Sequence, residues 1–107
     1  MAEPPVLRPA RPGDRAALEA LLRAAELSGE GLDEQFPAGY AVAEDAGALM
    51  GAAGIERYQG NGLLRSVVVA PRWRGRGLGE RLVRDRLAWA RAQGLGTVYL
   101  LTTTAAG

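Results

Sequence analysis

The stretch from Leu63 to Glu80 restricts the possible folds of this 107-residue chain more than any other part of the sequence. Its first half is apolar and has three consecutive valines at positions 67–69, and β-branched residues of this kind favour a buried strand. Pro71 follows closely, and because proline has no N–H to donate, it ends the strand. The stretch therefore begins as a strand that stops near residue 70.

Three glycines follow this strand at alternate positions, Gly75, Gly77 and Gly79. Glycine has no Cβ atom, so its backbone can approach another molecule closely and can adopt positive φ angles. We expect a helix to begin near Leu78, with its first N–H groups pointing into the glycine turn. Such N–H groups, together with the positive end of the helix dipole, bind phosphate. The stretch thus predicts a pyrophosphate-binding turn between a strand and a helix.

Three other interpretations of these glycines compete with this one. A P-loop needs a lysine after its last glycine, and the sequence contains no lysine. A dinucleotide-binding fingerprint needs the spacing G-x-G-x-x-G and an acidic residue about 20 positions later, but the third glycine is one position early and the residues around Tyr99 are not acidic. A loop that only turns a corner or touches RNA stays an alternative, although RNA-binding tracts usually repeat within disordered segments.

The pattern Arg74-Gly75-Arg76-Gly77-Leu78-Gly79, preceded by Val67-x-Val69-x-Pro71, resembles the acetyl-CoA-binding signature of the GNAT superfamily of N-acetyltransferases. The ordered combination of strand, proline, arginine, turn and helix carries the resemblance. It covers nearly the whole chain and is tightest over residues 63–104. Within the superfamily, the strands around Leu64 and Leu100 are most similar to a small branch of acetyltransferases associated with arsenic-resistance operons.

The remaining sequence predicts elements that fit this order. We expect strands over residues 6–9, 40–45, 48–58, 63–70 and 97–103, a turn over residues 59–62, and helices from Asp14 to about Ala25 and over residues 78–93. The second helix would bury Leu78, Leu82, Leu87 and Trp89 and would join two parallel strands by a right-handed crossover. Residues 28–39 read as a loop or a short irregular helix, which is either a wall of an acceptor pocket or a plain connector.

The resemblance implies an α/β fold with a mixed sheet, in which antiparallel N-terminal strands precede a parallel β-α-β unit. Residues 1–107 would form a single domain. GNAT members usually continue past the last predicted strand with one more helix and two more strands, so we expect this chain to be truncated at its C-terminus. An uncovered edge strand invites pairing, and we therefore expect a possible homodimer through the last strand.

The composition excludes several classes of function. The chain has no cysteine and no histidine, so it lacks a thiol nucleophile, disulfides and the commonest metal ligand, and we expect no metal site. No apolar run is long enough to span a membrane and the N-terminus does not read as a signal peptide, so we expect a cytoplasmic protein without a membrane partner.

Charge is distributed unevenly along the chain. Residues 1–56 carry four arginines and ten acidic residues, whereas residues 57–107 carry nine arginines and two acidic residues. The basic half contains the proposed phosphate site, so it would attract a polyanionic cofactor. Nucleic acid is the rival partner, but the acidic half and an aromatic content of only 6% argue against it.

The resemblance implies acetyl-CoA as the co-substrate. The backbone of three valines would pair with the pantetheine amides like an added strand, and N–H groups of the turn, with the arginine side chains near them, would hold the pyrophosphate. The residues that would bind the cofactor are Val67, Val68, Val69, Arg74, Gly75, Arg76, Gly77, Leu78, Gly79 and Glu80.

The acceptor side is less defined. Glu56 is the candidate general base, because it ends a strand next to the central one and the chain has no histidine. Arg65 and Ser66 are candidates for holding an acceptor carboxylate, although strand alternation puts them on opposite faces. The predicted reaction is direct attack of a small-molecule amine on acetyl-CoA in a ternary complex. The alternative is a CoA-binding module without efficient turnover, because the C-terminal part is missing.

Overall fold

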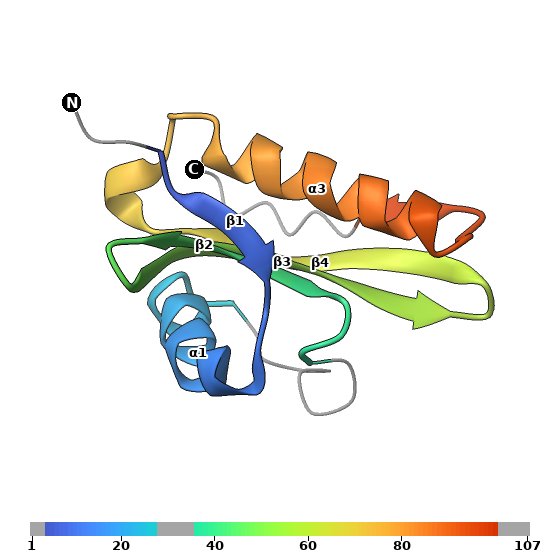
Figure 1. Ribbon diagram of the computed structural model, residues 1–107, viewed down its shortest axis with the longest axis horizontal. Helices are drawn as coiled ribbons and strands as arrows, with labels where there is room; N and C mark the ends of the chain where they lie inside the picture. The colour runs from blue at the N-terminus through green and yellow to red at the C-terminus, as the bar shows by residue number, and fades with distance from the viewer. Residues whose placement is uncertain (1–3, 28–35, 101–107) are drawn as a thin grey trace.

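The computed structural model describes residues 4–27 and 36–100 (Figure 1). The two α-helices are α1 (Arg15–Ala24) and α3 (Leu78–Ala92), and short 3-10 helices precede them at η1 (Pro12–Asp14) and η2 (Pro71–Trp73). The strands are β1 (Val6–Pro9), β2 (Tyr40–Asp45), β3 (Ala48–Tyr58), β4 (Asn61–Val69) and β5 (Val98–Leu100).

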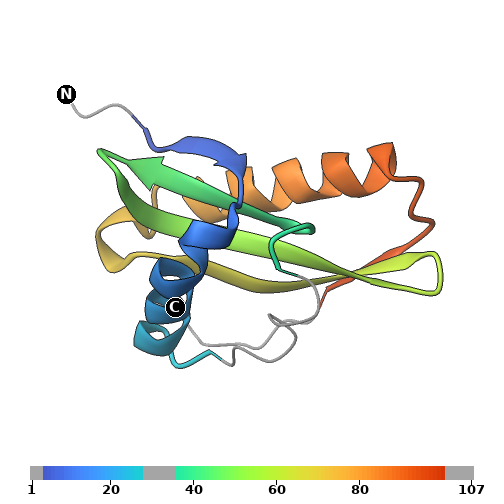
Figure 2. The ribbon, with the colours of Figure 1, turned by 60° about the horizontal axis from the view of Figure 1, so that its bottom comes forward.

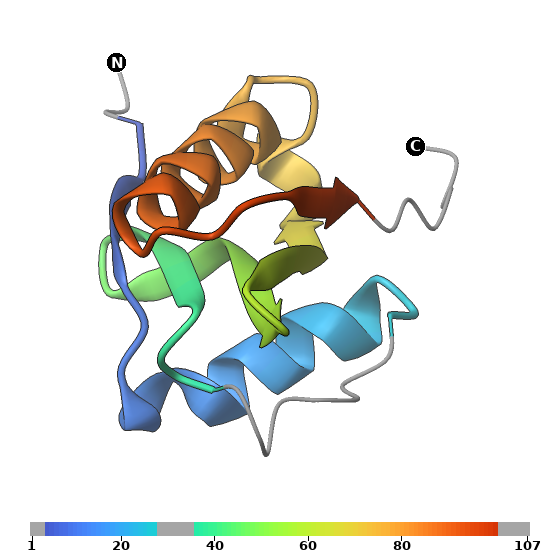
Figure 3. The same cartoon turned by 90° about the vertical axis from the view of Figure 1, so that its right-hand side faces the viewer.

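The five strands form one sheet in the order β1-β2-β3-β4-β5. Neighbouring strands are antiparallel except β4 and β5, which are parallel and are joined by the crossover through α3. The prediction of a mixed α/β sheet with antiparallel N-terminal strands and a parallel β-α-β unit is therefore confirmed. Helix α3 covers one face of the sheet and α1 the other (Figures 2 and 3).

Each helix buries apolar side chains against its own face of the sheet. Leu18 and Leu22 of α1 are fully buried among residues of β2, β3 and β4, as their spacing in the sequence predicts. Leu78 and Leu82 of α3 pack on the opposite face. The close approach of α3 depends on Gly51, because a Cβ atom there would lie 3.0 Å from Leu82 Cδ1 and 3.0 Å from the Val68 carbonyl oxygen.

Two sequence predictions about these elements are wrong. Leu87 was expected in the buried face of α3 but is 37% exposed, and Arg86 is buried in its place. The predicted four-residue turn over residues 59–62 is shorter, because Asn61 already belongs to β4 and only Gln59 and Gly60 turn the chain with positive φ. Positive φ at both central residues is typical of the two-residue turns whose twist matches that of the flanking strands.

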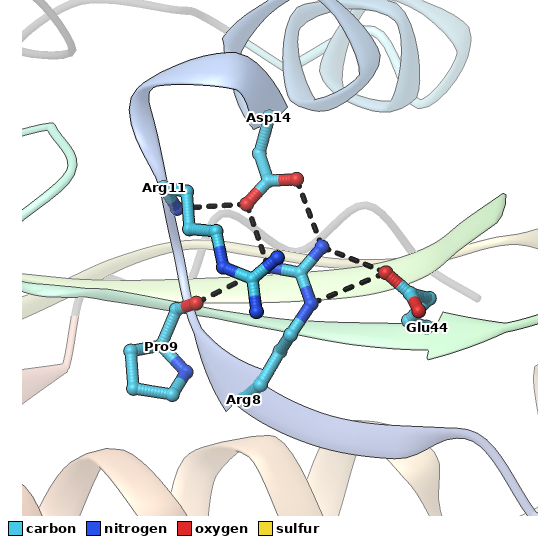
Figure 4. A network of polar contacts seen from close by, with 5 residues as sticks. All are labelled: Arg8, Pro9, Arg11, Asp14 and Glu44. Carbon is cyan, nitrogen blue, oxygen red and sulfur yellow. Dashed lines mark hydrogen bonds and ion pairs between the residues drawn. The ribbon is translucent and has the colours of Figure 1, made fainter. Parts of the chain in front are cut away.

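A network around Arg8 fixes the start of the chain against the sheet (Figure 4). The Arg8 guanidinium donates two hydrogen bonds to Asp14 of η1, at 2.8 and 2.9 Å, and two to Glu44 of β2, at 2.8 and 3.2 Å. The backbone N–H of Arg11 also donates to Asp14, at 2.7 Å. The hydrogen bonds from Arg8 lower the pKa of Asp14 to about 2 and raise the pKa of Arg8.

Within the described parts of the chain, no helix is long and apolar enough to cross a membrane.

Candidate functional site

The turn between β4 and α3 presents its glycine backbone to solvent. Gly75 and Gly77 have φ angles of 75° and 82°, which L residues with side chains rarely adopt. A Cβ atom built on either residue would meet nothing within 4 Å, so the space beside both is open. Helix α3 begins directly after Gly77, at Leu78, as the sequence predicts. The exposed first turn of α3 thus offers N–H groups and the positive end of the dipole to an anion.

The arginines of this turn are held in place rather than free in solvent. Arg72 forms an ion pair of 3.0 Å with Asp45 at the end of β2. Arg74 donates through Nε to the Val69 carbonyl oxygen at 3.2 Å. The guanidinium carbon of Arg76 lies 5.5 Å from the ring centroid of Trp73. These contacts keep three cations beside the glycine turn, where a polyanion would be attracted.

Glu80, in the first turn of α3, is also placed by a contact. It forms an i,i+4 ion pair of 2.5 Å with Arg84, and both side chains are largely exposed. Its backbone N–H belongs to the first turn of the helix, so it shares the orientation of its neighbours Leu78 and Gly79.

The edge of β4 continues from this turn. The N–H of Ala70 donates to the Met50 carbonyl of β3, and strand alternation therefore directs the N–H and C=O of Val69 away from β3. By the same alternation Val67 faces this edge, whereas Val68, opposite Ala52, faces β3. In the described residues β5 pairs with β4 only along residues 62–64. The edge near Val67 and Val69 therefore offers backbone groups for an added partner, although the Val69 carbonyl oxygen already accepts a hydrogen bond from Arg74 Nε.

A β-bulge at Ser66 changes the course of β4. Ala52 pairs with Val68, but Gly54 pairs with Arg65, so β4 contains one more residue than β3 over this interval. Ser66 takes up the extra residue with a φ of 59°. The sequence gives no glycine signal for this bulge, which is why strand alternation placed Arg65 and Ser66 on opposite faces.

The bulge brings both residues into one polar cluster, so that expectation is corrected. Arg65 donates to Glu56 at 2.8 Å, and the two side chains are 21% and 20% exposed. Ser66 forms a side-chain hydrogen bond with Tyr40. Burial raises the pKa of Tyr40, while the bond to Ser66 and the charge of Arg65 act in the opposite direction.

Tyr40 is the member of this cluster that the sequence did not reveal. It is 2% exposed and lies directly opposite Gly54, at the start of β2. Its position depends on the pairing of β2 with β3, which its own sequence neighbourhood does not encode. The alternation of β3 places Gly54 and Glu56 on one face. The space beside Gly54 on that face was the only sign in the sequence that another side chain, here Tyr40, could lie near Glu56.

The structure thus provides two connected regions. The glycine turn fits a phosphate, and the β4 edge leads from it to the cluster of Tyr40, Glu56, Arg65 and Ser66. Among residues 4–27 and 36–100 no three potential ligands of the types His, Cys, Asp and Glu gather as a metal-binding group. The chemistry that these regions offer is anion binding at one end and charge pairing at the other.

Comparisons with solved structures agree with this arrangement. The chain has a TM-score of 0.81 and 27% identity to the N-acetylglutamate synthase of Neisseria gonorrhoeae, in complex with coenzyme A and N-acetyl-glutamate, covering 92% of this chain and 25% of that one. It has a TM-score of 0.81 and 28% identity to Rv2747 of Mycobacterium tuberculosis, in complex with CoA, covering 94% of this chain and 66% of that one.

A third similar structure is a GNAT family acetyltransferase from Brucella melitensis in complex with acetyl-CoA. The TM-score is 0.76 and the identity 27%, covering 94% of this chain and 77% of that one. The chain therefore spans one quarter of the gonococcal enzyme and about two thirds of Rv2747. No curated protein matches it in sequence. The model of the acetyltransferase (GNAT) family matches residues 8–106, and the chain therefore belongs to that family.

Proposed function

We propose that the protein transfers the acetyl group of acetyl-CoA to a small-molecule amine. The observation that carries this proposal is the continuity of the exposed glycine turn with the outward-facing backbone of Val67 and Val69. A phosphate at the turn and an extended chain along β4 would use both regions at once. Family membership and the CoA complexes of the similar structures support the same cofactor.

Each part of this chain would have one task in the reaction. The N–H groups of residues 75–80 and the nearby arginines bind the pyrophosphate, whereas the N–H of Arg74 donates to the Pro71 carbonyl oxygen. The backbone of Val67 and Val69 orients the pantetheine arm as an added strand would. Glu56 takes the proton of the attacking amine, either directly or through water. Holding both substrates together supplies much of the rate enhancement.

A thermal shift titration with CoA tests the cofactor site first. We expect CoA to raise the melting temperature, because a ligand that binds only the native state stabilises it. Gly77→Asp should abolish this shift, because it puts a negative charge beside the phosphate. Gly60→Asp is the matched control, since Gly60 also has a φ near +80° and open space around it but lies in the β3–β4 turn.

Turnover is measured separately as release of free thiol from acetyl-CoA in the presence of a panel of amines. Amine-dependent thiol release supports the proposed transferase. A CoA shift without thiol release from any amine would favour the alternative, a CoA-binding module without efficient turnover. Absence of any shift at millimolar CoA would contradict both.

A further inference from the structure

One face of the sheet carries a strip of side chains beyond the part that α1 covers. The positions of their neighbours show which face this is. Leu64 and Val98 pack in the core on the α3 side, and the Arg57 guanidinium lies over Trp89 of α3. Because neighbouring residues of a strand alternate, the adjacent residues face the α1 side. These side chains, called the strip below, are Glu56, Tyr58, Leu63, Arg65 and Tyr99.

The strip combines one ion pair with apolar surface. Arg65 and Glu56 are joined at 2.8 Å, and each is about one-fifth exposed. Tyr58 is 70% exposed and Tyr99 is 56% exposed, which are large exposed fractions for aromatic residues. Leu63 pairs with Glu56 on one side and with Tyr99 on the other. The two tyrosines therefore extend the surface that begins at the ion pair.

The ion pair also lies at one end of the exposed β4 edge, along which the proposed cofactor would bind. Arg65 comes directly after Leu64, the last residue of β4 that pairs with β5 in the described residues, and directly before the bulge at Ser66. Val69 lies four positions after Arg65, which corresponds to about 13 Å along a strand. The pair is thus separated from the glycine turn by the length of the exposed β4 edge.

We infer that the acceptor is a zwitterionic α-amino acid with an aromatic or aliphatic side chain. This inference rests on the proposed function. The acceptor carboxylate pairs with Arg65, and its ammonium group pairs with Glu56. Each side chain thus loses its partner in the existing ion pair and gains an oppositely charged group of the acceptor. The side chain of the acceptor lies on Tyr58, Leu63 and Tyr99.

Charge balance explains why a zwitterion fits and other amines do not. A half-buried charge that loses its partner is destabilised by the full loss of its hydrogen bonds. An amine without a carboxylate would occupy Glu56 and leave Arg65 unpaired. An amino acid with an acidic side chain would bring a second carboxylate, but Arg65 is the only cation among the five residues of the strip. A neutral side chain avoids both costs.

The exchange also prepares the amine for reaction. Glu56 accepts one proton from the bound ammonium, and the free amine attacks the thioester carbonyl carbon. The C–N bond forms and the C–S bond breaks, and the electron pair of that bond leaves with sulfur. The thiolate takes up the second proton released from nitrogen, and Glu56 returns the first to water. The products are the N-acetyl amino acid, CoA and one proton.

Paired acceptors test the inference. Phenylalanine and leucine are compared with phenethylamine and isopentylamine, which lack only the carboxylate, and with glutamate and spermidine. We expect kcat/KM to be at least about tenfold higher for the two amino acids, because each charge-assisted hydrogen bond contributes roughly 1.5–3 kcal/mol. Equal rates with the decarboxylated amines, or a preference for glutamate or spermidine, would overturn the inference and leave the transferase in place.

Variants of the Arg65–Glu56 ion pair test whether Arg65 binds the acceptor carboxylate. Arg65→Gln should raise KM for phenylalanine by about tenfold or more and should lower KM for phenethylamine, because no Arg65 charge is then left unpaired when Glu56 binds the ammonium group. Arg15→Gln is the control, because Arg15 forms an ion pair of the same kind on α1, outside the strip. Urea denaturation of Arg65→Gln and of the double variant Arg65→Gln/Glu56→Gln shows whether any loss comes from unfolding, because only the single variant leaves a charge unpaired. The double variant is not used for turnover, since it lacks the proposed general base. An equal rise for both acceptors would contradict the role of Arg65.

Binding separates failure of this inference from failure of the proposed function. Calorimetry of phenylalanine with the CoA-loaded protein needs no turnover. If no amine is acetylated but phenylalanine binds and phenethylamine does not, the inference holds and the transferase proposal fails. If neither binds, the inference fails as well.

Discussion

Gly54 and Tyr40 lie directly opposite each other in β3 and β2, and the aromatic ring occupies the space of a side chain at position 54. A Cβ atom on Gly54 would lie 2.4 Å from Tyr40 Cε2, and the ring also contacts Phe36. We expect Gly54→Ala to lower the free energy of unfolding by about 2–3 kcal/mol, because the buried ring cannot move away without cost. Urea denaturation measures this change.

Gly13→Ala is the matched control for this substitution. A Cβ atom on Gly13 would meet nothing within 4 Å, and its φ is not in the left-handed region. We expect its free energy of unfolding to stay within about 0.5 kcal/mol of the parent. Equal losses for the two variants would show that the ring does not restrict position 54.

The carboxylate of Asp14 makes stability depend on pH in the acid range. Its pKa is about 2 in the folded protein against an ordinary value of 3.8, because Arg8 donates two hydrogen bonds to it. The contribution is therefore complete above pH 3.8 and decreases as the pH falls toward 2. We expect Asp14→Asn to remove roughly 2 kcal/mol of stability at pH 6 and to flatten the decrease below pH 4.

Denaturation at pH 6, 4 and 2 checks this dependence. Glu19→Gln serves as the control, because the ion pair of Glu19 with Arg15 is about 40% exposed on both sides and such pairs contribute at most about 1 kcal/mol. An Asp14→Asn profile parallel to that of the parent would contradict the assigned role of Arg8.

Helix α3 is attached to the sheet by a buried arginine as well as by leucines. Arg86 is 5% exposed, donates to the Gly39 carbonyl oxygen at 3.1 Å, and lies 5.1 Å from the Trp89 ring centroid. We expect Arg86→Met to lower the free energy of unfolding by about 1–3 kcal/mol, because the apolar stem is kept but the buried hydrogen bond is lost. Arg91→Met, at an exposed position of the same helix, should change it by less than about 0.5 kcal/mol. Thermal and urea denaturation distinguish the two variants.

Local signals predicted the bounds of α3 well. Gly77 precedes its first residue and Gly94 follows its end with a φ of 75°, so both ends are marked in the sequence. Local signals could not predict that Arg86, and not Leu87, is the residue buried against the sheet. It depends on where the Gly39 carbonyl lies, and that position is set by the pairing of distant strands.

The candidate site shows the same division. The glycine turn and the end of the strand at Pro71 follow from residue types alone. The polar cluster does not, because the bulge at Ser66 has no proline or glycine to mark it and Tyr40 arrives from another strand. The roles of Glu56, Arg65 and Ser66, and the similarity to the arsenic-resistance branch, stay predictions.

The two oppositely charged parts of the sequence interleave in the folded molecule. Ion pairs join Arg65 to Glu56 and Arg72 to Asp45, across the boundary between the acidic and basic parts. At the glycine turn Arg72 is paired in this way, whereas Arg74 and Arg76 form no ion pair that the described residues show. These two cations without an ion-pair partner among the described residues form a local concentration of positive charge beside the first turn of α3.

This concentration predicts a salt-dependent affinity for CoA. We expect the affinity to fall several-fold between 50 and 500 mM NaCl, because salt shortens the Debye length from roughly 14 to 4 Å. Arg76→Gln should weaken binding at low salt and reduce the salt dependence. Calorimetry at several salt concentrations measures both effects, and an affinity independent of salt would contradict the role of these cations.

The homodimer that the sequence predicts through the last strand has no support from the comparisons and stays a prediction. It rests on backbone pairing at the edge of β5 (Val98–Leu100) and not on the exposed Tyr99 side chain, which lies on a face of the sheet. Size-exclusion chromatography with light scattering checks this prediction, and a monomer at high concentration would contradict it.

The extra residue at Ser66 has a consequence for any change in the length of β4. Before Ser66 the even-numbered residue Leu64 packs toward α3 and Arg65 faces α1. After Ser66 the odd-numbered residues Val67 and Val69 pack toward α3 and Val68 faces α1. Deleting Ser66 would restore continuous alternation and would leave every other residue of β4 on the face that it already occupies. Both apolar layers of the sheet would therefore keep their side chains, and the polar cluster would lose one member, the hydroxyl group that bonds to Tyr40.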